Sequence, residues 1–402
     1  APKRCSILPE ADVLSKGIMH VHSSPFCSYE KQANNFQKSL FKTEKNKYTQ
    51  KQIVFRQEEK KVGLEKSSKI KLHQKFPKGP RNLITDVAGV TVGQVTLNDD
   101  EKEIHTGVTA IRGHKGNLFQ EKLAAGAAVI NGFGKSAGLV QIEELGTLET
   151  PIIMTNTLSV GTALSALTKY MLKENPDIGV TTGTVNCVVT ECNDGELNDI
   201  RGMHVTEADV WQALDHCSET FEEGAVGSGT GMCCMGLKGG IGSASRIVTV
   251  DGEEHTIGVI LMSNFGMRGN LTIDGFRPEG MKFPPQECEK GSVILVLATD
   301  LPLSDRQLRR MARRSVVGLC RTGSFLGNGS GDIAIAFSTA NRIPHYSEKK
   351  IFEMKAFRDD AMDLVFEATA EAAEEAVLSS LDHAATMKGA RGNVIYGLRE
   401  YL

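Results

Sequence analysis

The sequence predicts an α+β protein in which sheets and helices pack in layers. The run 292–299 is apolar on both faces and is bounded by turn residues, which indicates a fully buried strand. The stretch 359–386 is rich in Ala and Glu and has one apolar face, which indicates a long helix. Strand and helix patterns interleave irregularly and no internal repeat is visible, so layers are favoured over a regular βαβ series.

Local signals predict the remaining elements. Asp251-Gly252 is a hairpin turn between strands 245–250 and 256–263. Ser304-Asp-Arg-Gln307 is a capping box that begins a helix ending at Gly323. The other expected strands are 82–97 (as two short strands), 107–112, 125–130, 151–154, 185–190 and 332–337, and the other expected helices are 139–145, 159–173 and 206–218.

Charge divides the chain into two regions. The 402 residues include 46 Lys and Arg and 49 Asp and Glu, for a net charge of −3. Residues 1–80 carry 17 basic and 7 acidic residues, or +10, and the remainder carries −13. We therefore expect residues 1–79 to be a basic, disordered extension and 80–402 to be one folded domain. An acidic domain argues against nucleic acid as a partner, because phosphate binding requires clustered Lys and Arg.

Cysteine usage and hydropathy indicate the compartment. The nine cysteines are an odd number without a disulfide pattern, which favours a reducing environment. No apolar run reaches the roughly 18 residues of a membrane span, and the N-terminal region lacks the apolar core of a secretory signal. We therefore expect a cytoplasmic protein without a membrane partner. Cys233-Cys234 has no second Cys or His pair at metal spacing, so neither a metal nor a cofactor is expected.

Gly291-Ser292 is the first candidate for chemistry. It lies between a charged, Pro-rich segment (276–290) and the buried strand, so the hydroxyl would be fixed at the edge of the core. Gly291 has no Cβ and tolerates strained backbone. Such a serine could attack its own preceding carbonyl and cut the chain. Ser292 would then carry a free α-amine, of pKa about 8, that acts as base for its own hydroxyl. An ordinary turn is the alternative.

Gly134-Lys-Ser136-Ala-Gly138 is the strongest rival site. It matches G-x-S-x-G between a strand and a helix, the setting of a nucleophile elbow. That mechanism needs an acid and a histidine further along the chain, and no later histidine stands in a distinctive loop. A phosphate-binding P-loop is excluded because Val129 occupies the position of its first glycine.

Three further loops have weaker signals. The turn 327–332 places Ser330 and Asp332 two residues apart, on one face of an extended segment, where they could orient another group or merely form the turn. The glycine-rich passage 227–242 lacks nucleotide-binding spacing, so close backbone packing near a site is expected. The loop 191–195 is expected to be a turn, because its glycine comes one position too early for a calcium loop.

Ten motifs occur together in the order of one known family. The chain resembles the DmpA-type L-aminopeptidase/D-esterases and β-peptidyl aminopeptidases, which are self-processing N-terminal-nucleophile hydrolases. The similarity covers residues 80–402 and is carried by Pro80-Arg-Asn-Leu-Ile-Thr-Asp-Val-Ala-Gly-Val, Asn131-Gly-Phe-Gly-Lys-Ser-Ala-Gly, Glu143-Glu-Leu-Gly-Thr-Leu-Glu-Thr-Pro151, Thr155-Asn-Thr-Leu-Ser-Val-Gly161, Glu191-Cys-Asn-Asp-Gly195, Gly227-Ser-Gly-Thr-Gly-Met232, Lys238-Gly-Gly-Ile-Gly-Ser-Ala-Ser-Arg246, Asn264-Phe-Gly266, Gly291-Ser292 and Asn328-Gly-Ser-Gly-Asp332.

The resemblance implies a fold and a processing event. The fold would be a four-layer α/β/β/α sandwich related to the ornithine acetyltransferases. The catalytic domain 80–402 would be cut between Gly291 and Ser292 into an α chain ending at 291 and a β chain of residues 292–402. Ser292 Oγ would be the nucleophile and Asn264 would stabilise the oxyanion. Ser330 and Asp332 would orient the nucleophile and carry protons.

The resemblance also implies a substrate. Glu143 or Glu144 would face the ammonium of the first residue, in a site to which Asn131 also belongs. An ammonium exists only at a peptide N-terminus, so this pairing explains amino- rather than endopeptidase action. We expect a short peptide, amide or ester as substrate and a homo-oligomer of αβ units. The alternatives are an acyltransferase or amide-oligomer hydrolase on the same fold, or an uncleaved binding or scaffold protein.

Overall fold

The computed structural model describes residues 70–278 and 289–402, except for the side chain of Lys290. These described residues belong to one compact unit. The predicted disordered extension, residues 1–79, lies outside the described residues up to position 69. Positions 279–288 of the predicted Pro-rich segment also lie outside them.

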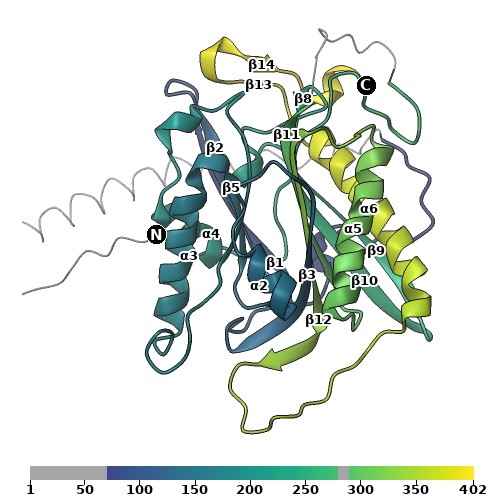
Figure 1. The fold of residues 1–402 in the computed structure, drawn as a ribbon. Helices are drawn as coiled ribbons and strands as arrows, with labels where there is room; N and C mark the ends of the chain where they lie inside the picture. Colours follow the sequence, from purple (N-terminus) through teal and green to yellow (C-terminus); the bar gives the residue numbers. More distant parts are fainter. Residues whose placement is uncertain (1–69, 279–288) are drawn as a thin grey trace, which may run out of the picture. The chain divides into compact units, whose positions relative to one another are not determined.

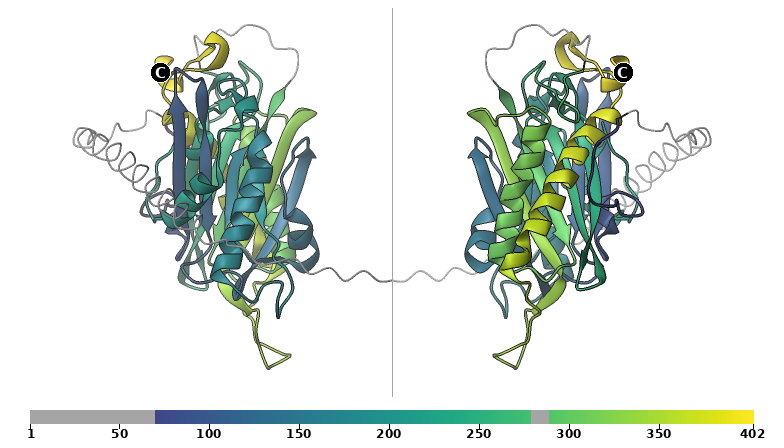
Figure 2. Two further views of the ribbon diagram at one scale, coloured as in Figure 1. Left: turned by 90° about the vertical axis from the view of Figure 1, so that its left-hand side faces the viewer. Right: turned by 90° about the vertical axis from the view of Figure 1, so that its right-hand side faces the viewer.

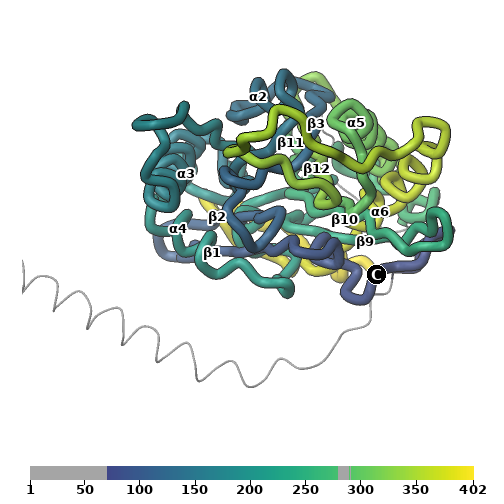
Figure 3. Tube along the Cα trace, turned by 90° about the horizontal axis from the view of Figure 1, so that it is seen from below, coloured from purple at the N-terminus to yellow at the C-terminus, as the bar shows by residue number. Residues whose placement is uncertain are grey.

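Two β-sheets pack face to face and each carries helices on its outer face (Figures 1 and 2). The first sheet has the order β1-β2-β5-β6 and is covered by α3 and α4. The second has the order β4-β3-β12-β11-β10-β9 and is covered by α5 and α6. Figure 3 shows the same succession of layers from below. The predicted four-layer α/β/β/α fold is confirmed.

The elements have the following bounds. The first sheet consists of β1 (Thr91–Asp99), β2 (Ile104–Arg112), β5 (Ile152–Asn156) and β6 (Val188–Cys192); the second consists of β3 (Glu121–Gly132), β4 (Thr147–Leu148), β9 (Gly240–Val250), β10 (Glu253–Asn264), β11 (Lys290–Thr299) and β12 (Gly329–Pro344). The helices are α2 (Leu139–Leu145), α3 (Val160–Glu174), α4 (Glu207–Asp215), α5 (Asp305–Arg321) and α6 (Met362–Asp382), with 3-10 turns at η1 (Ile84–Asp86), η2 (Thr157–Ser159), η3 (Ile200–Gly202), η4 (Gly227–Gly229), η5 (Asp359–Ala361), η6 (Ala390–Gly392) and η7 (Leu398–Glu400). Two small hairpins are β7 (Cys233–Cys234) with β8 (Leu237–Lys238), and β13 (Met387–Lys388) with β14 (Val394–Ile395).

Strand β11 is buried on both faces, as its unbroken apolar sequence predicts. Val293, Leu295 and Leu297 belong to the core beneath α5 and α6. Ile294 and Val296 belong to the core between the two sheets. A third core lies between the first sheet and helices α3 and α4. Because every side chain from position 293 to 298 is buried, the strand holds Ser292 in a fixed place.

Most of the predicted elements are present, and one prediction is wrong. Residues 82–97 do not form two strands. They form η1 and then β1, because Asp86 accepts hydrogen bonds from the backbone N–H of Arg81 and Leu83 and closes a turn. Helix α5 begins at the predicted capping box, in which the N–H of Gln307 donates to Ser304 Oγ.

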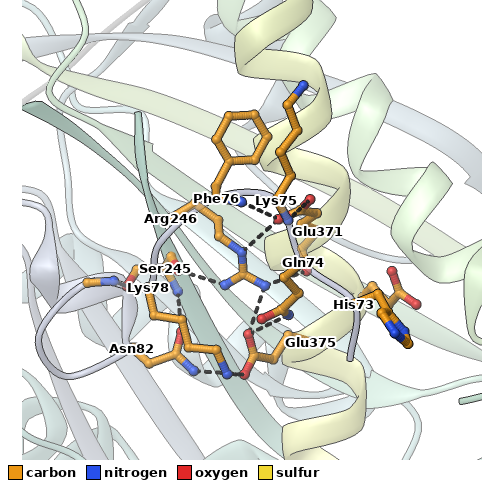
Figure 4. A network of polar contacts seen from close by, with 12 residues as sticks. His73, Gln74, Lys75, Phe76, Lys78, Asn82, Ser245, Arg246, Glu371 and Glu375 are labelled. Carbon is orange, nitrogen blue, oxygen red and sulfur yellow. Dashed lines mark hydrogen bonds and ion pairs between the residues drawn. The ribbon is translucent and has the colours of Figure 1, made fainter. Parts of the chain in front are cut away.

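Residues 73–79, which the sequence analysis assigned to the extension, lie against the folded body, and Gln74, Lys75 and Lys78 among them contact helix α6 (Figure 4). The N–H of Lys75 donates to Glu371 (2.8 Å), and Arg246 of β9 lies fully buried between Glu371 and Glu375. The described body of the protein therefore begins before residue 80. This charged cluster fixes the N-terminal strap, residues 73–79, to the outer helix layer.

Candidate active site

Ser292 lies at the start of β11, where the strand meets a pocket. Its neighbour on β10 is Asn264 in the antiparallel ladder, and its neighbour on β12 is Gly331 in the parallel ladder. Ser292 is 3% exposed, and its Oγ donates a hydrogen bond to the carbonyl oxygen of Gly291 at 2.6 Å. The hydroxyl is therefore adjacent to the peptide group that precedes it, as an attack on that peptide requires.

Gly291 is required by close packing rather than by strained backbone. Its φ is not positive, so the backbone strain that the sequence analysis allowed for at this glycine is not seen. A Cβ at this position would lie 2.1 Å from the carbonyl oxygen of Asn264 and 3.0 Å from Phe265 Cα. Only glycine allows β11 to pass this close to the end of β10.

The Asn264 side chain is held from two sides. Its Oδ1 accepts a hydrogen bond from the N–H of Cys233 (2.9 Å), and its Nδ2 donates to the carbonyl oxygen of Asn193 (2.9 Å). These two bonds fix the orientation of the amide. The second N–H of Nδ2 has no partner in residues 70–278 and 289–402, and Asn264 lines the same pocket as Ser292.

Ser330 and Asp332 form a buried pair on β12, beside Ser292. Ser330 Oγ donates to Asp332 Oδ1 at 2.6 Å, and both residues are 0% exposed. The other carboxylate oxygen, Oδ2, has no partner within the described part of the chain. Burial raises the pKa of Asp332 to about 6, an effect that the Ser330 hydrogen bond partly offsets. A carboxyl with this pKa can accept and return a proton near neutral pH.

The pocket in front of Ser292 has a volume of about 1120 Å³ and is lined by apolar, polar and charged groups. Its residues are Phe133, Lys135, Thr157, Glu191, Asn193, Gly195, Glu196, Ile200, Cys233, Gly236, Asn264, Gly266, Met267, Arg268, Glu289, Gly291, Ser292, Phe325, Gly327, Asn328, Gly329 and Ile395. Glu289 joins two of its walls, since one carboxylate oxygen accepts from the N–H of Gly266 (2.8 Å) and the other from the N–H of Gly327 (2.8 Å).

Glu191 is a site residue that the sequence analysis did not recognise. It lies at the carboxyl end of β6, beside the parallel strand β5, and lines the pocket while only 2% exposed. Its carboxylate accepts hydrogen bonds from the N–H of Lys135 (2.8 Å) and from Thr157 Oγ1. The available signal was a carboxylate directly after a buried apolar strand, the position at which site residues of layered folds gather.

The structure does not bring Glu143 and Glu144 to this pocket. Both lie exposed on α2, whose buried side chains are Gln141 and Ile142, and neither is among the lining residues. Asn131 is not a lining residue either. Its Nδ2 donates to the carbonyl oxygens of Gly327 (3.1 Å) and Ser330, so it supports the turn beside the pocket.

The structure also bears on the rival serine, Ser136, on metal binding and on membrane-spanning helices. Ser136 is half-buried, does not line the pocket, and has no hydrogen-bond partner for its Oγ in the described residues. Over residues 70–278 and 289–402, no three His, Cys, Asp or Glu side chains form a group that could hold a metal ion. None of the described helices has the length and apolar character needed to cross a bilayer.

A layered sandwich with a serine at the start of a central strand is typical of hydrolases of the N-terminal-nucleophile class. The family model for peptidase family S58 matches residues 82–395. The β-peptidyl aminopeptidase BapA of Sphingosinicella microcystinivorans is 37% identical over 346 residues, which cover 80% of this chain and 86% of BapA. The chain therefore belongs to peptidase family S58, and the predicted class of serine aminopeptidase or amidase is confirmed.

Two solved structures are similar over the same region. The PH0078 protein from Pyrococcus horikoshii OT3 is 53% identical, with a TM-score of 0.78, covering 82% of this chain and 94% of that one. The L-aminopeptidase D-Ala-esterase/amidase from Ochrobactrum anthropi, a prototype for the serine aminopeptidases with a variant of the Ntn hydrolase fold, is 38% identical with a TM-score of 0.76. It covers 81% of this chain and 93% of its own.

Proposed function

We propose that this chain cuts itself between Gly291 and Ser292 and then releases N-terminal residues from short peptides, amides or esters through an acyl-enzyme on Ser292. The single observation that carries the proposal is the position of Ser292. Its hydroxyl is hydrogen-bonded to the carbonyl of Gly291 at the wall of a pocket that also contains the buried carboxylate of Glu191.

Self-cleavage would begin with attack of Ser292 Oγ on the carbonyl carbon of Gly291. The bond from that carbon to the Ser292 nitrogen breaks, the nitrogen takes up a proton, and the Gly291 acyl group is left as an ester on Oγ. Water then hydrolyses the ester. The products are a carboxylate on Gly291 and a free α-amine on Ser292, with the hydroxyl restored.

Turnover would use the same oxygen. The α-amine of Ser292 takes the proton of Oγ as the oxygen attacks the substrate carbonyl, and returns a proton to the leaving amine. The free N–H of Asn264 stabilises the oxyanion. Asp332 Oδ2, buried and unpartnered among the described residues, would accept a hydrogen bond from the new amine. Water then releases the acyl group from Oγ.

Glu191, rather than Glu143 or Glu144, would recognise the substrate ammonium. It lines the pocket and its orientation is fixed by Lys135 and Thr157, while the two residues on α2 face away into solvent. A buried carboxylate favours a ligand that brings a positive charge, and a peptide backbone carries one only at its N-terminal α-ammonium. An internal peptide bond would leave the carboxylate unpaired.

The apolar surface of α2 supports assembly of αβ units into a homo-oligomer. Val140 is 83% exposed and Leu145 is 64% exposed on this short helix. Large exposed apolar side chains on one short element are a feature of protein–protein interfaces. Light scattering on the purified protein should give a mass that is a multiple of one αβ unit, and Val140→Asp with Leu145→Asp should lower it.

Denaturing electrophoresis and turnover of L-alanine and β-alanine p-nitroanilides test the proposed function. Wild-type protein should give two bands and release p-nitroaniline, while Ser292→Ala should give one band and no turnover. The matched control Ser136→Ala should behave as wild type. A single wild-type band without turnover would favour the alternative of an uncleaved binding protein. Transfer of the acyl group to an added amine in preference to water would favour the acyltransferase alternative.

A further inference from the structure

Lys238 is a fully buried lysine within the glycine-rich passage 227–242. Its Nζ donates hydrogen bonds to three backbone carbonyl oxygens, of Gly229 (3.2 Å), Met232 (2.7 Å) and Gly239 (2.7 Å). The mechanism above assigns no role to this cation.

The β7–β8 hairpin brings Lys238 opposite Cys233. Met235 and Gly236 form its two-residue turn, both with positive φ (53° and 78°), as a type I′ turn requires. A Cβ at Gly239 would lie 2.5 Å from the carbonyl oxygen of Ser263, so glycine is also needed where the passage turns around the ammonium. The glycines therefore allow backbone carbonyls to converge on one charge.

The carbonyl of Met232 links Lys238 to Asn264, the proposed oxyanion donor, through one peptide group. The Met232 carbonyl and the Cys233 N–H belong to the same peptide group. Lys238 Nζ donates to the oxygen of that peptide (2.7 Å), and the N–H of the same peptide donates to Asn264 Oδ1 (2.9 Å). A positive charge on the carbonyl side polarises the peptide and strengthens the N–H as a donor.

A buried ammonium on Lys238 carries a desolvation cost that a side chain serving only to fill space would not have. Burial lowers the pKa of Lys238 to about 8, while the nearby thiol of Cys233 and the carboxylate of Asp194 act in the opposite direction. No acidic side chain accepts a hydrogen bond from Nζ within the described residues, so the ammonium is balanced mainly by peptide dipoles. An uncharged side chain of the same length would fill the space without this desolvation cost.

We propose that Lys238 is a positioning residue for catalysis, which holds and polarises the Met232–Cys233 peptide and thereby fixes the Asn264 amide as oxyanion donor. The inference depends on the proposed function, because it assigns Lys238 a part in the oxyanion stabilisation that Asn264 provides. It also gives the glycine-rich passage a purpose other than nucleotide binding.

The test uses Lys238→Met, which keeps the length of the side chain and removes the charge. With kcat referred to the processed fraction on denaturing gels, kcat should fall by about 10- to 100-fold, as for loss of an outer partner of a catalytic group, while KM changes less than about threefold. Val259→Ala is the matched control. It makes a cavity on the same strand as Asn264, beneath the helices, and should lower the melting temperature without changing kcat.

A double-mutant cycle separates positioning from general loss of structure. If Lys238 acts through Asn264, then Lys238→Met should reduce kcat little further in the Asn264→Ala background. An equal loss of kcat in both backgrounds, or an unchanged kcat in Lys238→Met alone, would overturn the proposal. Wild-type kcat in Asn264→Ala itself would also overturn the proposal, because Asn264 would then not be the oxyanion donor, whereas the proposed function would fail only if the wild type gave a single band without turnover. Should Lys238→Met not fold, Lys238→Gln keeps donor groups without charge, and wild-type kcat in that variant would equally overturn the proposal.

Discussion

Asn264 and Ser292 are directly paired residues on adjacent antiparallel strands, at the pocket, where β10 ends and β11 begins. Paired positions in such a ladder place their side chains on the same face of the sheet. The amide donor and the nucleophilic hydroxyl are therefore set by strand register rather than by flexible loops. This pairing makes the geometry of the site a property of the sheet itself.

Asn264→Ala removes the donor while leaving Ser292 in place. Loss of one oxyanion donor lowers kcat by about 10²- to 10³-fold, and KM should change little because the bond forms mainly in the transition state. Steady-state kinetics on the p-nitroanilides measure both values. An unchanged kcat would show that Asn264 only ties the backbone of Asn193 and Cys233.

Gly291→Ala tests the close packing at the cut site. The new Cβ would lie 2.1 Å from the Asn264 carbonyl oxygen, so β11 must shift away from β10 at its first residues. Self-cleavage should slow by at least about tenfold, because small displacements of reacting groups are costly. The fraction of cut chain against time on denaturing gels measures the rate. Gly183→Ala, at an exposed position where no atom lies within 4 Å of the new Cβ and φ is not positive, is the matched control.

Glu191→Gln tests recognition of the substrate ammonium. Removing the charge should raise KM for L-alanine p-nitroanilide and lower kcat/KM by roughly tenfold or more, as for loss of a buried charge pair. Glu144→Gln, on the exposed face of α2, is the matched control and should leave kcat/KM unchanged. A loss of kcat/KM in Glu144→Gln but not in Glu191→Gln would instead assign the ammonium site to α2 and show that Glu191 does not bind the ammonium.

Asp332→Asn tests the buried carboxyl through the pH dependence of stability. The pKa of Asp332 is raised from 3.8 to about 6 in the fold, so the folded chain binds this proton more tightly than the unfolded chain. Its contribution to stability is therefore largest below pH 4 and is lost as pH rises to about 6. In the uncut Ser292→Ala background, Asp332→Asn should raise the melting temperature more at pH 7 than at pH 4. Equal shifts at both pH values would contradict the raised pKa.

The sequence predicted the central strand and its serine because both depend on local pattern. The apolar run after Ser292 has no polar position to expose, so only a doubly covered strand accommodates it. The capping box at Ser304 is equally local. Residues 82–86 were mistaken for a strand because the turn depends on the Asp86 side chain bonding to nearby backbone, a contact that apolar alternation does not reveal.

Contacts between distant segments explain what the sequence did not show. The pairing of Asn264 with Ser292 depends on the register of two strands, and Lys238 meets the same peptide as Asn264 only through a hairpin and the Cys233 N–H. Glu191 looked like part of an isolated turn because its partners, Lys135 and Thr157, come from other loops. Glu143 and Glu144 were chosen by resemblance alone, and the helix that carries them turns both side chains to solvent.

Intact-mass measurement on catalytically active protein tests the central claim most directly. The account predicts two chains, one ending at Gly291 and one beginning at Ser292 with a free amine, in every preparation that hydrolyses substrate. Active protein in which residues 291 and 292 are still joined would contradict it, because the base assigned to Ser292 would not exist.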